Sequence, residues 1–156
     1  MDDINIVLTR IDNRLVHGQV GVSWCKAVGT NMIVVADDIA AKDTLQQQLM
    51  EMTAVSSGSY IRFFTVDYCG EIIGQAGPDF RIFLICRTPA VVCRLVEAGV
   101  PIKDVNIGNM HFEQGKRPLS KKVYVDDNDE ADIRFLKSKG IRVFIQDVPT
   151  DEIINL

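Results

Sequence analysis

The sequence predicts an α/β protein with a doubly wound, mainly parallel central sheet and helices on both of its faces. Segments with the composition of strands alternate with segments of helical periodicity along the whole chain. Several strand segments are unbroken apolar runs, which are typical of parallel strands buried on both faces. The connections are short and no repeat or linker interrupts them, so residues 1–156 are expected to form a single domain.

The first half of the chain supplies three predicted strands, each followed by a predicted helix. The strands cover residues 4–8, 31–36 and 60–65, and the helices cover residues 19–28, 39–54 and 66–73. The first helix repeats Val20, Trp24 and Ala27 at helical spacing. The second helix has an apolar stripe whose members are Leu45, Leu49 and Met52.

The second half continues the same alternation. Strands are predicted at residues 81–86, 104–107, 121–125 and 141–146, helices at residues 89–98 and 128–139, and a polar loop at residues 108–118. Thr88 is a suitable N-cap, and Pro89 suits the first position of a helix because proline lacks the N–H that would be unpaired there. Gly99 and Gly140 are suitable helix ends.

Composition excludes several classes of function. The chain is 47% hydrophobic and 24% charged with a net charge of −4, which describes an ordinary globular protein and argues against a nucleic-acid partner. No apolar run approaches the roughly 18 residues of a membrane span, and the opening MDDINIVL lacks a signal-peptide pattern, so we expect a cytoplasmic location. Neither a GxGxxG motif after the first strand nor a P-loop motif is present.

The four cysteines show no spacing of a metal or redox site. Cys25, Cys69, Cys86 and Cys93 form no CxxC pair and have no neighbouring histidines. We therefore expect free thiols, no metal site and no cofactor.

Residues 10–20, RIDNRLVHGQV, form the stretch with the clearest chemical potential. They connect the first predicted strand to the first predicted helix, where a parallel sheet has its ligand crevice and a helix offers unpaired N–H groups. Arg10 and Arg14 supply guanidinium forks that match phosphate oxygens, and Gly18 permits close approach of the backbone. His17 offers a nucleophilic nitrogen near pH 7. This stretch is expected to bind a phosphoryl group.

Other interpretations of these residues remain open. A histidine beside a glycine at a helix start is often a solvated or capping residue, and loop arginines often form surface ion pairs. Asp12 could hold an arginine, fix the tautomer of the imidazole, or cap the loop backbone; the structural role is slightly favoured.

Four further residues are expected to line the crevice: Asp37, Asn106, Gly108 and His111. Asp37 and Asp38 follow the second strand, where at least one should interact with a helix N-terminus and the other could bond to the His17 loop. Asn106 and Gly108 lie at a strand end. His111 could bind phosphate, contact a partner, or have no role.

The stretch resembles the phosphorylation loop of IIB components of the mannose/sorbose family of the bacterial sugar phosphotransferase system. The residues that match its pattern R-I-D-x-R-L-x-H-G-Q-V are Arg10, Ile11, Asp12, Arg14, Leu15, His17, Gly18, Gln19 and Val20. Residues 34–43, 106–125 and 141–151 also resemble recurring family features. One departure is Asn109, where a glycine is common; asparagine tolerates a positive φ better than most residues.

The resemblance implies a covalent phosphohistidine relay. His17 would take a phosphoryl group from a IIA component, by family analogy on Nδ1, and pass it to a sugar carried by the membrane IIC and IID components. Arg10 and Arg14 would assist, and Asp12, Asn13, Gly18 and Gln19 would shape the phosphate loop. The family is often dimeric, which makes a homodimer an expectation. The transported sugar is not specified, with a slight preference for amino sugars. The competing hypothesis is a non-catalytic anion-binding or regulatory module.

Overall fold

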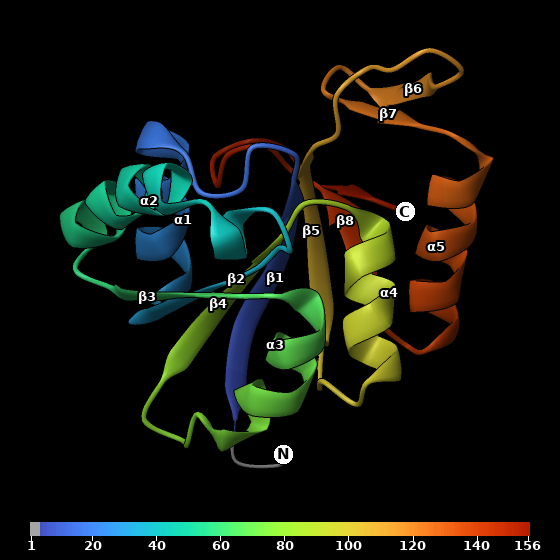
Figure 1. The fold of residues 1–156 in the computed structure, drawn as a ribbon. Helices are drawn as coiled ribbons and strands as arrows, with labels where there is room; N and C mark the ends of the chain where they lie inside the picture. The colour runs from blue at the N-terminus through green and yellow to red at the C-terminus, as the bar shows by residue number, and fades with distance from the viewer. Residues whose placement is uncertain (1–3) are drawn as a thin grey trace.

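A seven-stranded sheet runs through the centre of the protein, in a computed structural model that describes residues 4–156 (Figure 1). Its strand order is β3-β2-β4-β1-β5-β8-β9, and all neighbours pair parallel except β8 and β9. The strands are β1 (Asn5–Asp12), β2 (Met32–Ala36), β3 (Tyr60–Phe64), β4 (Arg81–Cys86), β5 (Asp104–Asn109), β8 (Arg142–Ile145) and β9 (Ile154–Asn155).

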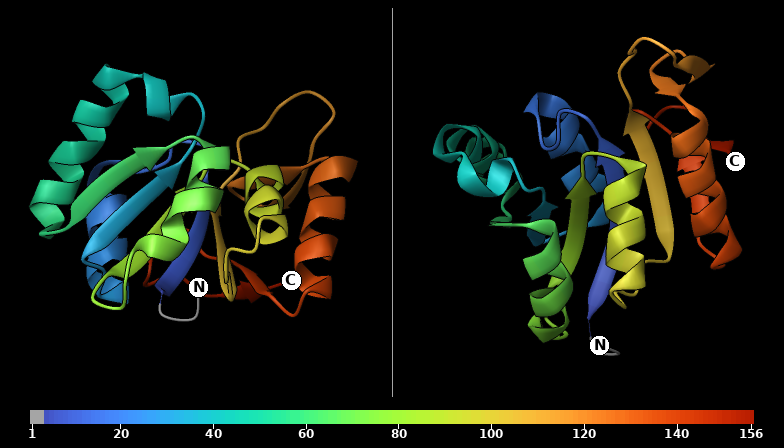
Figure 2. Two further views of the ribbon diagram at one scale, coloured as in Figure 1. Left: turned by 60° about the horizontal axis from the view of Figure 1, so that its bottom comes forward. Right: turned by 45° about the vertical axis from the view of Figure 1, so that its right-hand side comes forward.

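Helices cover both faces of this sheet, which confirms the predicted doubly wound fold class (Figure 2). The helices are α1 (Gly18–Val28), α2 (Thr44–Ser57), α3 (Val66–Ile72), α4 (Pro89–Glu97) and α5 (Asp127–Ser138), with 3-10 turns η1 (Ala40–Lys42) and η2 (Ile73–Gln75). Successive residues of β2 point to opposite faces. Ile33 packs in the core under α1 and α2 with Trp24, whereas Val34 packs in the core under α3, α4 and α5 with Leu95.

Helix starts follow the expected capping chemistry, with one prediction changed. The Thr88 hydroxyl accepts from the N–H of Val91, and Pro89 is the first residue of α4, as predicted. The single helix predicted at residues 39–54 is instead η1 followed by α2. Asp43 separates them because its carboxylate accepts from the N–H of Gln46 and so caps a new helix.

The predicted polar loop at residues 108–118 was partly wrong. β5 extends to Asn109, and the chain then forms an antiparallel hairpin of β6 (Arg117–Ser120) and β7 (Val123–Val125), which projects beyond the sheet (Figure 1). β6 lies largely in solvent, so its residues lack the apolar alternation that identifies a strand. Asn109 is not among the residues with positive φ, so the absence of a glycine there requires no left-handed backbone.

The central position of β1 determines where its end meets the rest of the fold. β1 pairs with β4 on one side and β5 on the other, with Ile11 opposite Cys86 and Asp12 opposite Asn109. Residues that follow β1 therefore lie between the segments that follow β4 and β5. This crevice at the carboxyl ends of the strands is the usual ligand position in an open α/β sheet.

Two predictions from composition can be compared with the fold. The four cysteines are buried and free. No helix within residues 4–156 is long and apolar enough to cross a membrane. The prediction that the chain has no signal peptide concerns the opening MDDINIVL. Residues 1–3 of that stretch lie outside the described part of the chain.

Candidate functional site

His17 lies at the N-cap of α1, at the end of the short loop that follows β1. Its backbone is extended (φ −145°, ψ 134°), and its side chain is 23% exposed. Leu15 and Val16 anchor the loop, since both are buried in the core under α1 and α2. Leu15 adopts a left-handed φ of 57°, which turns the chain sharply before His17. The buried side chains of Leu15 and Val16 thus hold the loop so that the imidazole lies at the surface of the crevice.

Asp12, the last residue of β1, fixes the orientation of this imidazole. Its Oδ2 lies 3.1 Å from His17 Nε2, and its Oδ1 accepts from the N–H of Arg14 at 2.8 Å. An ionised carboxylate can only accept, so Nε2 donates and carries the proton. In the neutral form of the imidazole Nδ1 then holds the lone pair, and Nδ1 has no hydrogen-bond partner within the described residues. Asp12 therefore performs both the tautomer-fixing and the loop-capping roles left open by the sequence.

The pKa of Asp12 reflects this environment. Burial acts to raise its pKa, but the hydrogen bonds from His17 and the Arg14 N–H and the positive charge of Arg10 together outweigh burial. The pKa consequently lies below the ordinary value of an aspartate, and the carboxylate is ionised at neutral pH.

Arg10 occupies a different position from the one the sequence predicted. It lies within β1 rather than in the loop, and its side chain is 3% exposed. Its guanidinium donates to Asp12 Oδ2 at 3.0 Å and to Asn106 Oδ1 at 2.6 Å, and also to the backbone carbonyl of Gln146. The predicted strand ended at residue 8 with its hydrophobic run, whereas β1 continues to Asp12. Arg10 supports Asp12 from below, and burial lowers the pKa of its guanidinium.

Asn106 and Gly108 of β5 accommodate that arginine. The Asn106 amide group donates to the Gln146 carbonyl at 2.9 Å while its oxygen accepts from Arg10. A Cβ built on Gly108 would overlap the Arg10 guanidinium, so a larger residue at this position would displace that guanidinium. Both residues lie beneath the crevice as supports of Arg10.

Arg14, Gly18 and Gln19 are exposed around His17. The Arg14 side chain forms neither a hydrogen bond nor an ion pair with any residue in the range 4–156. Gly18 begins α1 with a φ of 47°, and the N–H groups of a first helical turn lack intrahelical acceptors. A free guanidinium and a helix N-terminus beside the same imidazole make a suitable site for an anion.

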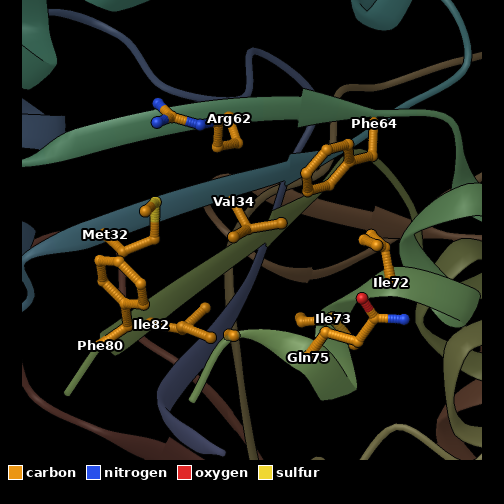
Figure 3. Close-up of a pocket in the computed structure, with 10 residues that line it drawn as sticks. Met32, Val34, Arg62, Phe64, Ile72, Ile73, Gln75, Phe80 and Ile82 are labelled. Carbon is orange, nitrogen blue, oxygen red and sulfur yellow. The ribbon is translucent and has the colours of Figure 1, made fainter. Parts of the chain in front are cut away.

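A shallow hollow extends from His17 toward α2. Its lining residues are Arg14, Val16, His17, Gly18, Gln46, Leu49, Met50, Met52 and Thr53. A separate apolar pocket, lined mainly by β2, β3 and η2, lies on the other face of the sheet (Figure 3). None of the residues that line this pocket belongs to the loop that follows β1, whose anchors Leu15 and Val16 lie on the opposite face of the sheet.

Arg87 is a residue of the site that the sequence analysis missed. It directly follows β4, forms a bidentate ion pair with Asp37 at 2.9 and 3.0 Å, and donates to the backbone carbonyl of Asn13 at 2.8 Å. Asn13 in turn donates through its side chain to the Arg87 carbonyl. The position of Arg87 immediately after a buried strand was the feature of the sequence that could have identified it.

The two aspartates after β2 serve different partners. Asp37 accepts from the N–H of Ala40 at the start of η1 and reaches the His17 loop only through Arg87. Asp38 accepts from the N–H of Val66, the first residue of α3. The expected helix-terminal role therefore holds for both, while a direct bond from either one to the loop is not found within residues 4–156.

His111 approaches the loop by its backbone. Its N–H donates to Asn13 Oδ1, while the residue itself is exposed. Asn13 thereby connects the segments that follow β4 and β5. Within the described residues, no group of three or more metal-ligating side chains occurs.

The chain matches a known protein family over nearly its whole length. The family model of the sorbose subfamily IIB component of the phosphotransferase system (PTS) matches residues 6–156. The chain belongs to this family. It is therefore a PTS IIB component of the sorbose type, a class that takes part in sugar transport as a transferase and works with IIA, IIC and IID components.

Individual relatives align with this IIB component over nearly its whole length. It is 58% identical to the N-acetylgalactosamine-specific phosphotransferase enzyme IIB component 1 of Escherichia coli K12, covering 97% of this chain and 96% of the relative. The crystal structure of the E. coli N-acetylgalactosamine-specific IIB component 1 superposes with a TM-score of 0.94 at 57% identity, covering 97% and 99% of the two chains.

A third relative is a longer protein than this chain. The chain is 36% identical to the mannose-specific EIIAB component of E. coli K12 over 96% of its own length, but it spans only 46% of that relative.

Proposed function

We propose that this IIB component accepts a phosphoryl group on Nδ1 of His17 from the phosphohistidine of a IIA component, and passes it to a sugar presented by IIC and IID components. The observation that carries the proposal is the Asp12–His17 hydrogen bond, which engages Nε2 and leaves Nδ1 free beside Arg14 and the N-terminus of α1. The protein would act on the cytoplasmic side of the membrane.

The chemistry is a transfer between two imidazoles. The Nδ1 lone pair of His17 attacks phosphorus in line, the N–P bond of the donor breaks, and the electron pair of that bond returns to the donor nitrogen. The His17 ring, which keeps its proton on Nε2, becomes cationic, and the ionised Asp12 stabilises that charge. Arg14 and the first N–H groups of α1 would offset charge on the equatorial oxygens of a loose transition state.

The second transfer reverses these events. An oxygen of a sugar hydroxyl attacks phosphorus, the bond to Nδ1 breaks, and its electron pair returns to His17. The hydroxyl proton leaves to a base on the membrane components. The loop would bind only the phosphoryl group. We therefore expect that His17, Arg14 and Asp12 do not distinguish one sugar from another. We propose N-acetylgalactosamine as the transported sugar, because the relatives of highest identity described above carry that specificity.

The test is labelling by the general phosphotransferase proteins with a IIA component of an N-acetylgalactosamine system. Wild type should take up one acid-labile, alkali-stable phosphoryl group, as a phosphohistidine does. His17→Ala should take up none, and His111→Ala, which removes the other histidine, should be labelled like wild type. Label on His17→Ala at the wild-type level would reject the relay in favour of a non-catalytic anion-binding module.

A further inference from the structure

The outer face of α2 carries an exposed apolar stripe. Leu45, Leu49, Met52 and Val55 are 67%, 61%, 67% and 80% exposed. Their spacing places them on adjacent turns of one helix face, as the sequence predicted for the first three. The core contacts of α2 are made instead by Met50 and Ala54 on the opposite side. Apolar side chains gathered on one exposed face are typical of a surface that another molecule covers.

This α2 stripe is continuous with the His17 site. Leu49 and Met52 line the same hollow as Arg14 and His17, so the middle of the stripe adjoins the exposed imidazole. A protein that reaches His17 from this side must contact α2. The arrangement combines an apolar surface with the positive charge of Arg14 at its edge, and Arg14 has no ion-pair partner within residues 4–156.

We propose that the α2 stripe is the docking surface for the phosphorylated IIA component, an inference that rests on the proposed function. The donor must bring its phosphohistidine to His17, and a folded protein that does so covers the surface around that residue. Its phosphoryl group is anionic and complements Arg14. A few apolar side chains suit a small interface that releases its partner after each transfer.

The mannose-specific relative also favours a IIA unit as the occupant. Its name, EIIAB component, describes IIA and IIB parts in one chain, and the present chain spans 46% of it. Linkage of two units raises their effective concentration, so a weak contact between them is sufficient. A separate IIB chain would use the same contact with a separate IIA chain.

The test uses Leu49→Asp and Met52→Asp, with Tyr60→Asp as a matched control. Tyr60 is 63% exposed, like the stripe, but it starts β3 at the opposite end of the strands from His17. Initial rates of transfer are measured over a range of concentrations of a phosphorylated IIA component from an N-acetylgalactosamine system. The two stripe variants should raise KM by about tenfold or more while kcat stays within about twofold; about 1.4 kcal/mol of binding corresponds to tenfold. The control should change neither.

A titration with the same IIA component in its unphosphorylated form measures binding without phosphoryl transfer. The affinity should fall in both stripe variants, in parallel with the rise in KM. If the proposed function is wrong, wild-type His17 will not be labelled. The titration measures binding alone, so its result does not depend on phosphorylation of His17. Unchanged KM and unchanged binding in both stripe variants would overturn the docking proposal. It would also be overturned if only the onward transfer to sugar were impaired, or if the variants only converted an oligomer to a monomer in sedimentation.

Discussion

Asp12 Oδ2 accepts hydrogen bonds from both His17 Nε2, at 3.1 Å, and Arg10, at 3.0 Å. One buried oxygen therefore connects a strand residue beneath the sheet crevice to the imidazole at its surface. The hydrogen bonds from His17 and the Arg14 N–H, together with the positive charge of Arg10, keep the carboxylate ionised, and the carboxylate fixes the proton of His17 on Nε2. The reactivity proposed for Nδ1 is thus determined by residues that solvent does not reach.

Asp12→Asn is expected to slow phosphoryl transfer to His17 by roughly 10- to 100-fold. The substitution removes a hydrogen bond to a charged group, worth about 1.5–3 kcal/mol, and leaves the cationic ring unbalanced. Ring ¹⁵N chemical shifts should report a single tautomer protonated at Nε2 in wild type and a mixture in the variant. Asp38→Asn is the control, since Asp38 interacts with Val66 and Arg94. Equal transfer rates in wild type and Asp12→Asn would contradict the assigned role.

Arg14→Ala should lower the transfer rate by roughly 10- to 100-fold, because it removes one charge-assisted contact with the phosphoryl group. Stability should change by less than about 0.5 kcal/mol, since the side chain is exposed. Arg14→Lys should recover part of the rate, because lysine keeps the charge but loses the planar fork. The comparison requires stopped-flow transfer rates and urea unfolding curves. A normal rate in Arg14→Ala would remove Arg14 as a phosphate-binding residue.

The general fold was predictable because its signals are local. An apolar run such as residues 81–86 indicates a strand buried on both faces, and Thr88 with Pro89 indicates a helix start. Arg10 was misplaced because its burial depends on partners distant in the chain. Asn106 and Gln146 lie 96 and 136 residues away, and only the assembled sheet brings them together.

Arg87 and the α2 stripe show two other limits of the sequence. The role of Arg87 depends on Asp37 and Asn13 after neighbouring strands, and strand order is not encoded by any short motif. The stripe has the periodicity of a core face, yet it is exposed. Periodicity identifies the side of a helix that avoids water but not whether the chain itself or a partner covers it.

Gly108→Ala is expected to destabilise the protein by about 1–3 kcal/mol, the usual cost of overpacking. The added Cβ would overlap the Arg10 guanidinium and displace it from Asp12 and Asn106. Urea unfolding measures the loss. The control is Gly70→Ala, where the nearest atom to an added Cβ is the side-chain carbon of Ala98 at 3.1 Å. If Gly108→Ala is as stable as wild type, Arg10 does not need the space that glycine leaves.

The Asp37–Arg87 ion pair should make stability depend on pH in the acid range. Burial acts to raise the pKa of Asp37, but the hydrogen bonds from Arg87 and the Ala40 N–H outweigh it and hold the pKa below 3.8, its ordinary value. The stabilisation is therefore complete above pH 3.8 and is lost as the pH falls through the lowered pKa. Asp37→Asn should be less stable than wild type at pH 7, by about 1–3 kcal/mol, because Arg87 loses its charged partner.

Urea unfolding at pH 7, 4 and 3 tests this dependence. The difference between wild type and Asp37→Asn should narrow as the pH falls below 3.8, because protonation removes from wild type the charge that the variant already lacks. Asp43→Asn is the control: it retains a side chain able to cap α2 and has no ion pair within residues 4–156. A difference that stays constant from pH 7 to pH 3 would mean that Asp37 contributes through its shape and hydrogen bonds rather than its charge.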